Sequence, residues 1–266
     1  MKVAIRALQT RCRRVRSGLA NPDDAIPDPS DFAPFTYSRR SHCERFAHNG
    51  LERRLYGTSR NLSDWRLKRY QDLLTLSFIE SWVPEGARLL EVGGGDSRII
   101  RFLKGRYELW NADKLEGLGC GPRQVKEIGF KLVRAYLGDF SPQLADSSFD
   151  FVFSISALEH IPQSDPGLLP RIHADLNRVL KPGGYSLHCL DVVLCPDHIR
   201  MNKLLPYLFT HQETCNPFVA FELIRRDSDL FVLPESVYIR NWQPRTGQSY
   251  ADFGMPFSYN ILWRKT

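Results

Sequence analysis

Apolar residues recur along the chain in two patterns, a near-helical spacing and short continuous runs. The first pattern predicts helices and the second predicts strands. From Ser63 to Val83, one apolar series repeats at near-helical spacing, with Pro84 directly after it: Trp65, Leu67, Tyr70, Leu73, Leu74, Leu76, Ile79 and Trp82. This spacing predicts one helix that Ser63 or Asp64 caps at its start and Pro84 ends.

Beyond Pro84, short apolar runs alternate with helical or irregular segments. Five runs predict strands: Arg88–Val92, Tyr107–Ala112, Leu132–Leu137, Phe149–Ser154 and Tyr185–Asp191. Strands that alternate with helices are typical of a parallel sheet covered on both faces. Residues 167–180 predict one of the connecting helices, and residues 192–217 predict a helical insertion. Two later runs, 235–242 and 257–265, predict two more strands.

The first sixty residues differ in composition. Residues 20–37 contain four prolines and several acids, which predicts an extended linker. Much of the net charge of +6 comes from arginine clusters before residue 70, beginning with "RCRRVR" at 11–16. Such a basic leader could bind nucleic acid or an anionic surface, although no nucleic-acid motif accompanies it. Its Arg-rich, acid-poor start also resembles an organelle transit segment.

The whole-chain composition narrows the class of protein. A hydrophobic content of 42% and a charged content of 25% over 266 residues are typical of a soluble globular protein. No apolar run approaches the length of a membrane span. The six cysteines are scattered, without a C-x-x-C pair or a metal-like Cys/His spacing, so we expect reduced thiols, a cytoplasmic location and no metal site.

The most informative stretch is "LLEVGGGDSR" (Leu89–Arg98), a strand that runs into a glycine turn before a helix. A Walker loop would need a Lys-Ser/Thr pair that the stretch lacks, and the dinucleotide fingerprint would need glycine where Arg98 stands. What remains is acid-x-G-x-G, with Glu91, Gly93 and Gly95. Such a turn lets a ligand approach closely, and the helix that follows offers N–H groups to a carboxylate as well as to a phosphate.

This stretch resembles motif I of the class I S-adenosylmethionine-dependent methyltransferases, with Ser97 in place of the third glycine. Three later segments resemble further motifs of that family in the same order: "YELWNADK", "LGDFSPQLADSSFDFVFSISALEHI" and "LNRVLKPGGYSL". The resemblance covers about a hundred residues, from Leu89 to Leu187. It is to the branch that contains many small-molecule methyltransferases.

The resemblance implies S-adenosylmethionine as cofactor and nine contact residues: Glu91, Gly93, Gly95, Asp113, Lys114, Asp139, Phe140, Ser154 and Ser156. Asp113 would accept the ribose hydroxyls, although a helix N-cap would suit it too. Asp139 would hold the adenine amino group, with Phe140 against the ring, and Ser154 to Ser156 would lie beside the methionine part. The "RVLKPGG" segment (178–184) would be structural.

The resemblance further implies a Rossmann-like, doubly wound α/β fold: a mostly parallel seven-stranded sheet with an antiparallel last strand, a helical N-terminal extension and an insertion after the fifth strand. We therefore expect a basic leader and linker over residues 1–60 and a methyltransferase domain over residues 61–266. Within that domain, a substrate-side insertion would cover about 193–235.

The implied reaction is in-line transfer of the methyl group to a small-molecule acceptor. Because sulfonium is a good leaving group, alignment and desolvation can supply most of the acceleration. A general base is needed only if the acceptor loses a proton, and His160 in "ALEHI" is the candidate. Glu159 and His160 could equally cap or pair at a helix start. Asp191 and His198 form a second polar group that could face substrate.

Three other interpretations remain open. The basic leader could make RNA or protein the substrate, although the tetrapeptide of amino-methylating enzymes and a catalytic cysteine motif are absent. A non-catalytic binding protein with the same fold is a second alternative, which the retained Glu91, Asp113 and Asp139 disfavour. A nicotinamide oxidoreductase is the third, which Arg98 disfavours. The sequence predicts neither the acceptor nor the oligomeric state.

Overall fold

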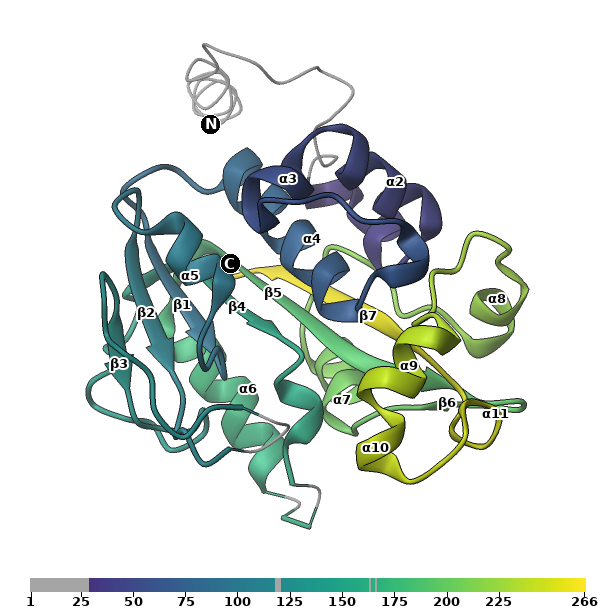
Figure 1. Ribbon diagram of the computed structural model, residues 1–266. Coiled ribbons are helices and arrows are strands. Elements are labelled where there is room, and N and C mark those ends of the chain that lie inside the picture. Colours follow the sequence, from purple (N-terminus) through teal and green to yellow (C-terminus); the bar gives the residue numbers. More distant parts are fainter. Residues whose placement is uncertain (1–28, 118–120, 163, 166) are drawn as a thin grey trace, which may run out of the picture.

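The computed structural model describes residues 29–266, apart from 118–120, 163 and 166. Its centre is a seven-stranded sheet with helices on both faces (Figure 1). The strands are β1 (Arg88–Val92), β2 (Glu108–Ala112), β3 (Lys131–Val133), β4 (Phe149–Ile155), β5 (Leu180–Leu194), β6 (Ile199–Arg200) and β7 (Met255–Arg264). The basic cluster at residues 11–16 lies outside the described residues.

The sheet has the order β3-β2-β1-β4-β5, with β6 beyond β5 and β7 also paired to β5. Strands β1 to β5 run parallel, whereas β6 and β7 run antiparallel to β5. The chain moves outward from β1 to β3 and then returns to the other side of β1 with β4. This is the point at which open α/β sheets bind ligands, at the carboxyl ends of their strands. The predicted fold class is confirmed.

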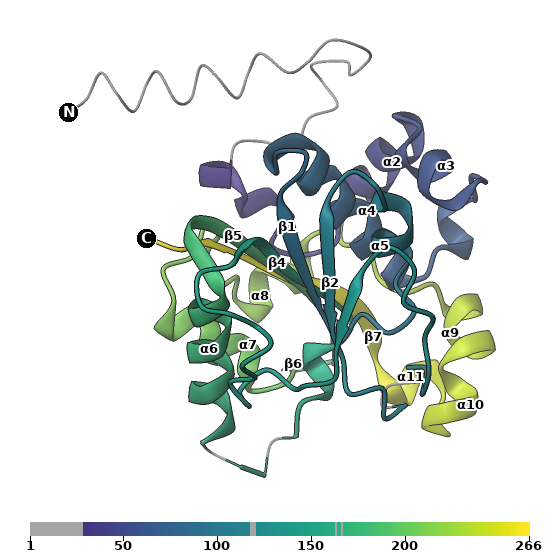
Figure 2. The ribbon, with the colours of Figure 1, turned by 90° about the vertical axis from the view of Figure 1, so that its left-hand side faces the viewer.

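The α-helices are α2 (Arg40–His48), α3 (Leu51–Tyr56), α4 (Leu67–Trp82), α5 (Arg98–Leu103), α6 (Leu168–Val179), α7 (Leu204–His211), α8 (Phe221–Arg226), α9 (Glu235–Asn241), α10 (Gln243–Thr246) and α11 (Tyr250–Phe253). Short 3-10 turns are η3 (Pro29–Asp31), η4 (Ala33–Phe35), η5 (Leu62–Asp64) and η7 (Leu158–His160). Figure 2 shows α6 and α7 on one side of the sheet and α2, α3 and α4 on the other.

Alternation of side chains along the strands builds a separate core on each face of the sheet. Phe151 and Phe153 of β4 pack with α4 in one core, whereas Val152 packs with α6 in the other. Because both faces are covered, the central strands are buried along almost their whole length.

The N-terminal helices share the first of these cores. Phe46 of α2 and Leu55 of α3 belong to the same buried cluster as Tyr70 of α4, and the ring centroids of Phe46 and Tyr70 are 6.1 Å apart. Part of the span predicted as leader and linker is therefore ordered and packed. The domain boundary at residue 60 remains a prediction.

Three local predictions were wrong. Residues 235–242, predicted as a strand, contain α9 (Glu235–Asn241), because Pro234 precedes a helix whose Val237 and Tyr238 are buried. The third strand ends at Val133, where the Ala135 N–H bonds to the Val133 carbonyl at 2.9 Å in a tight turn. The first long helix begins at Leu67 and not at residues 63–64, because those residues form a 3-10 turn and Trp65 is extended.

The predicted helical insertion after the fifth strand is confirmed only in part. Strand β5 continues to Leu194, and the antiparallel β6 follows before α7 begins at Leu204. The predicted helix over 167–180 is α6, which ends one residue earlier, where β5 begins.

Candidate functional site

The glycine turn lies directly after β1, at the point where the strand order reverses. Gly93 and Gly95 have φ angles of 66° and 51°, in the left-handed region that L side chains rarely adopt. A Cβ atom on Gly93 would lie 2.6 Å from the Ala157 Cβ, and one on Gly95 would lie 2.7 Å from the Pro122 Cδ. The turn is therefore held between the segments that follow β4 and β2, and only glycine fits both positions.

The side chain of Glu91 packs closely against the glycine turn. A Cβ on Gly94 would lie 2.7 Å from the Glu91 Cδ, and the Glu91 residue is only 2% exposed. Burial raises the pKa of Glu91 to about 7, against the lowering effect of a hydrogen bond with Ser97. Its Oε2 has no hydrogen-bond partner among the described residues. Glu91 is therefore a buried carboxyl with one unused acceptor beneath the turn.

Asn111 on β2 holds the turn from the side, a role that the sequence analysis missed. The Gly94 N–H donates to Asn111 Oδ1 at 3.2 Å, and Asn111 Nδ2 donates to the Gly95 carbonyl at 3.0 Å. The side chain lies in a strand that the apolar pattern assigned to the core, and it is fully buried. Only the position of Asn111 beside the turn reveals its function.

Asp113, at the end of β2, is brought to the turn as predicted. Its Oδ2 accepts the Gly95 N–H at 2.8 Å, and its Oδ1 accepts the Leu115 N–H at 2.7 Å. Each carboxylate oxygen retains a second lone pair, so Asp113 can accept further hydrogen bonds. No helix begins at the described residues that follow it, which removes the N-cap alternative. The neighbouring Lys114 places its Nζ 5.5 Å from the centroid of the Tyr136 ring.

The turn after β3 carries Asp139 and Phe140. Phe140 has a φ of 52° and an exposed fraction of 43%, an unusual conformation and exposure for a large apolar residue. Asp175 on α6 fixes this turn, because its Oδ2 accepts the N–H groups of Gly138 at 2.8 Å and Phe140 at 3.2 Å. Asp139 Oδ2 accepts the Tyr136 N–H at 3.4 Å. The exposed ring is thus held by a well-bonded backbone.

Ser154 and Ser156 lie in different environments. Ser154 is fully buried, with its Oγ 2.8 Å from His188 Nδ1, and the other ring nitrogen of His188 lies 2.8 Å from Ser186 Oγ. Burial lowers the pKa of His188 to about 3, so this network is neutral. The structure does not bring Ser154 to the surface of the site. Ser156, just past β4, has a φ of 46° and lies at the carboxyl edge.

Ser156 belongs to a polar cluster that reaches α4. Its Oγ donates to Gln71 Oε1 at 2.6 Å, and Gln71 Nε2 donates to Asp191 Oδ1 at 2.7 Å. Gln71 Nε2 also lies 3.1 Å from Ser258 Oγ on β7. The helical spacing gave no sign of Gln71, because Gln71 is one of several polar residues in α4 and only the packing against β5 and β7 distinguishes it. Here it connects α4 with β5 and β7.

Glu159 and His160 follow this cluster on η7. The Glu159 side chain is 9% exposed, and neither of its oxygens has a hydrogen-bond partner among the described residues. Burial raises the pKa of Glu159 well above its ordinary value, and the nearby Asp191 raises it further. His160 is 46% exposed, with Nε2 at 3.9 Å from Glu159 Oε1. His160 therefore presents an accessible imidazole beside a buried carboxyl.

Of the second predicted polar pair, only Asp191 joins the site. His198 lies on the turn between β5 and β6, where its Nδ1 contacts the exposed Asp197 at 2.6 Å. Among the described residues, no group of three or more His, Cys, Asp or Glu residues is placed to hold a metal ion. The helices in the same part of the chain include none that is long and apolar enough to cross a membrane.

Residues 90–187 match the model of a methyltransferase domain, which confirms the family resemblance over that span. An uncharacterized protein of Mycobacterium tuberculosis is 32% identical over 144 residues, covering 50% of this chain and 45% of its own. A sterol 24-C-methyltransferase of Gibberella zeae is 28% identical over 160 residues, 58% of this chain and 37% of its own. The chain therefore spans less than half the length of these curated relatives.

Among solved structures, this chain is similar to a 1,6-didemethyltoxoflavin-N1-methyltransferase of Burkholderia thailandensis. The match covers 95% of this chain and 93% of the other chain, with 16% sequence identity and a TM-score of 0.40.

Proposed function

Because residues 90–187 match the model of a methyltransferase domain, we propose that this chain transfers the methyl group of S-adenosylmethionine to a small-molecule acceptor. The observation that carries the proposal is the bonding of Asp113 to Gly95, because it joins the end of β2 to the glycine turn at the reversal of strand order. A ligand with a ribose would find in Asp113 an acceptor for its hydroxyl groups there.

The residues at this edge fit such a ligand. Asp113 retains acceptor capacity for ribose hydroxyls, and the exposed ring of Phe140 offers a flat apolar surface to a base. Asp139 would hold the adenine amino group, and Lys114, Glu91 and Ser156 would complete the surroundings. We leave Ser154 out of this set because its side chain is buried in the network with His188.

S-adenosylmethionine supplies, when bound, a methyl group on a sulfonium that needs no further activation. The chain must then align the acceptor and keep water away. Gln71, Ser156 and Asp191 form a bonded, largely buried polar surface for this purpose at the ends of β4 and β5.

His160 would accept a proton from an acceptor that loses one as it attacks. The imidazole is accessible, so an acceptor held at this edge of the sheet could reach it. The second accessible histidine of this region, His198, is paired with Asp197 away from the cluster and has no such role in the proposal.

We also place the chain in the cytoplasm, on the support of cysteines that form no disulfide: Cys43, Cys189 and Cys195. Methylation of RNA or protein through the basic leader remains a hypothesis without structural support, since residues 11–16 lie outside the described residues.

Incubation of the chain with methyl-labelled S-adenosylmethionine and a whole-cell extract, separated afterwards into low-mass, RNA and protein fractions, tests the activity. We expect label to appear in at least one low-mass product and S-adenosylhomocysteine to form with it. Label found only in RNA or protein would contradict the small-molecule assignment. Absence of transfer to every fraction would contradict the proposed activity.

A further inference from the structure

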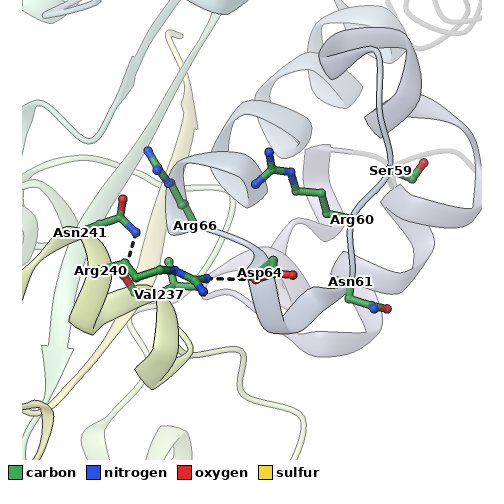
Figure 3. A pocket seen from close by; sticks show the side chains of 8 residues that line it. All are labelled: Ser59, Arg60, Asn61, Asp64, Arg66, Val237, Arg240 and Asn241. Atoms are coloured by element: carbon green, nitrogen blue, oxygen red, sulfur yellow. Dashed lines mark hydrogen bonds and ion pairs between the residues drawn. The ribbon is translucent and has the colours of Figure 1, made fainter.

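A cavity lies outside the span that matches the methyltransferase domain. It has a volume of about 510 Å³ and lies between residues 59–66 and helix α9. Its charged lining residues are Arg60, Asp64, Arg66 and Arg240 (Figure 3). Three guanidinium groups and one carboxylate therefore face one open space.

Among the described residues, one of the three arginines, Arg240, has an acidic partner. Arg240 Nη2 lies 3.0 Å from Asp64 Oδ1, and both side chains are about half exposed. Within the described part of the chain, the guanidinium groups of Arg60 and Arg66 make no ion pair or hydrogen bond. In the view of Figure 3 both lie above the Arg240–Asp64 pair. The cavity thus presents two unneutralised positive charges.

The backbone that carries these two arginines is fixed. Trp65 between them is fully buried, and its Nε1 donates to the Arg60 carbonyl at 3.2 Å. The Arg60 N–H donates in turn to the buried Glu52 Oε1 at 3.1 Å. Arg66 occupies the N-cap position of α4, where no side chain caps the helix. Because this backbone is already fixed, a ligand would bind without first ordering it, so the cost of binding is low.

Helix α4 joins this cavity to the candidate active site. Leu67 is its first residue, and Gln71, which bonds to Asp191, lies four residues further on. Four residues of α-helix correspond to about 6 Å along the axis. Lys68 lies between them and acts electrostatically on Glu91, Asp191 and Glu159. The arginine cavity and the polar cluster therefore lie at neighbouring turns of one helix.

We propose that Arg60 and Arg66 bind an anionic group, a phosphate or a carboxylate, carried by the methyl acceptor. Guanidinium groups bind both anions through paired, charge-assisted hydrogen bonds. The anionic end of the acceptor would occupy the arginine cavity, and its reacting atom would lie beside Gln71 and Ser156. This inference rests on the proposed function, since it assigns the acceptor class of the same site.

Calorimetric titration of the full chain with inorganic phosphate and, separately, with sodium acetate tests the site at constant ionic strength. We expect the wild-type chain to bind at least one of the two, and the stronger ligand indicates phosphate or carboxylate as the natural group. The double variant Arg60→Gln/Arg66→Gln should bind at least tenfold more weakly. Arg45→Gln/Arg226→Gln, which removes two exposed arginines elsewhere, should bind as the wild type does.

Three results would overturn the anion site: no binding of either anion by the wild type, unchanged binding by the Arg60/Arg66 variant, or equal loss in the control. An acceptor identified by labelled transfer adds a kinetic test. We expect it to carry an anionic group, and the Arg60/Arg66 variant to raise its KM at least tenfold with kcat within twofold. A neutral acceptor, or an unchanged KM, contradicts the assignment.

Titration of the same samples with S-adenosylmethionine separates the two proposals. Unchanged cofactor affinity in both double variants shows that the glycine site is intact. If no sample binds S-adenosylmethionine, the proposed function fails, and the anion titrations then decide the arginine site by themselves.

Discussion

Arg98 Nη1, on the first residue of α5, lies 2.5 Å from Asp72 Oδ2 on α4, and the Asp72 side chain is only 2% exposed. The Tyr56 hydroxyl on α3 donates to the same oxygen at 2.5 Å. The residue that excludes a dinucleotide fingerprint is therefore also the residue that ties the glycine turn to the N-terminal helices. The extension outside residues 90–187 helps to position the candidate cofactor site.

Replacement of Arg98 by Met should destabilise the folded chain by about 1–3 kcal/mol, because it leaves the buried Asp72 carboxylate without its guanidinium. The matched control is Arg101→Met on the same helix. Arg101 pairs with Asp96, and both side chains are more than half exposed, so we expect a change within about 0.5 kcal/mol. Urea denaturation measures both values. Equal destabilisation by the two variants would contradict a special role for the Arg98–Asp72 pair.

Glu91 should make the stability fall as the pH rises. Burial raises its pKa from 4.5 to about 7 in the folded chain. Between these values the folded chain binds more protons than the unfolded chain, so the free energy of unfolding decreases with rising pH and stays lower above pH 7. For this one group, the decrease is about 3 kcal/mol.

Glu91→Gln removes that contribution while the other buried acids remain. We therefore expect the free energy of unfolding of Glu91→Gln to increase relative to the wild type between pH 5 and pH 8. Urea denaturation at the two pH values measures it. A difference between the two proteins that is the same at both values would show that Glu91 is ionised throughout, against its burial.

Replacement of Gly93 by Ala tests the close packing of the turn. The added Cβ would meet Ala157, and the φ of 66° is unfavourable for alanine, so we expect a loss of about 2–4 kcal/mol and weaker binding of S-adenosylmethionine. Gly105→Ala separates the two causes, since Gly105 has a φ of 82° but no atom within 4 Å of an added Cβ. It should cost about 1–2 kcal/mol and leave cofactor binding unchanged. Equal effects on binding would refute the packing argument.

His160→Gln should slow the reaction without weakening the binding of the cofactor. For an acceptor that loses a proton as it attacks, we expect kcat to fall by about 10²- to 10⁴-fold, with unchanged affinity for S-adenosylmethionine. Single-turnover rates with the acceptor found by labelled transfer measure the effect. His198→Gln, which alters the exposed pair with Asp197, should retain the wild-type rate. A wild-type rate for His160→Gln as well would remove the histidine from the mechanism.

The apolar pattern predicted the sheet well where strands are buried on both faces. Strands β1, β2, β4 and β7 lie where it placed them, because continuous apolar runs between turns have few other uses in an α/β fold. It failed at residues 235–242, where Val237, Tyr238 and Ile239 have strand propensity but follow a proline that starts a helix. The Tyr238 side chain packs against Phe253, with their ring centroids 5.3 Å apart, and this tertiary packing favoured the helix over a strand.

The site was predictable only where a motif carries it. The glycine turn and Asp113 follow from their order along the chain, because strand ends meet at one edge of the sheet. Gln71 and Asn111 could not be found in this way, since each belongs to an element that the apolar pattern assigned to the core and no motif includes it. Their partners, Asp191 and the turn itself, lie far away in sequence or on another strand. Ser154 shows the reverse: it satisfies the motif, yet the alternation of β4 turns it into the core.

The glycine turn and Asp113 are proposed to hold S-adenosylmethionine. Calorimetric titration of freshly purified, cofactor-free chain with S-adenosylmethionine and with NAD tests this assignment. We predict one-site binding of S-adenosylmethionine and none of NAD, with affinity for the former about 1–3 kcal/mol weaker in Asp113→Ala. No heat with S-adenosylmethionine, or the same affinity in Asp113→Ala, would contradict the claim.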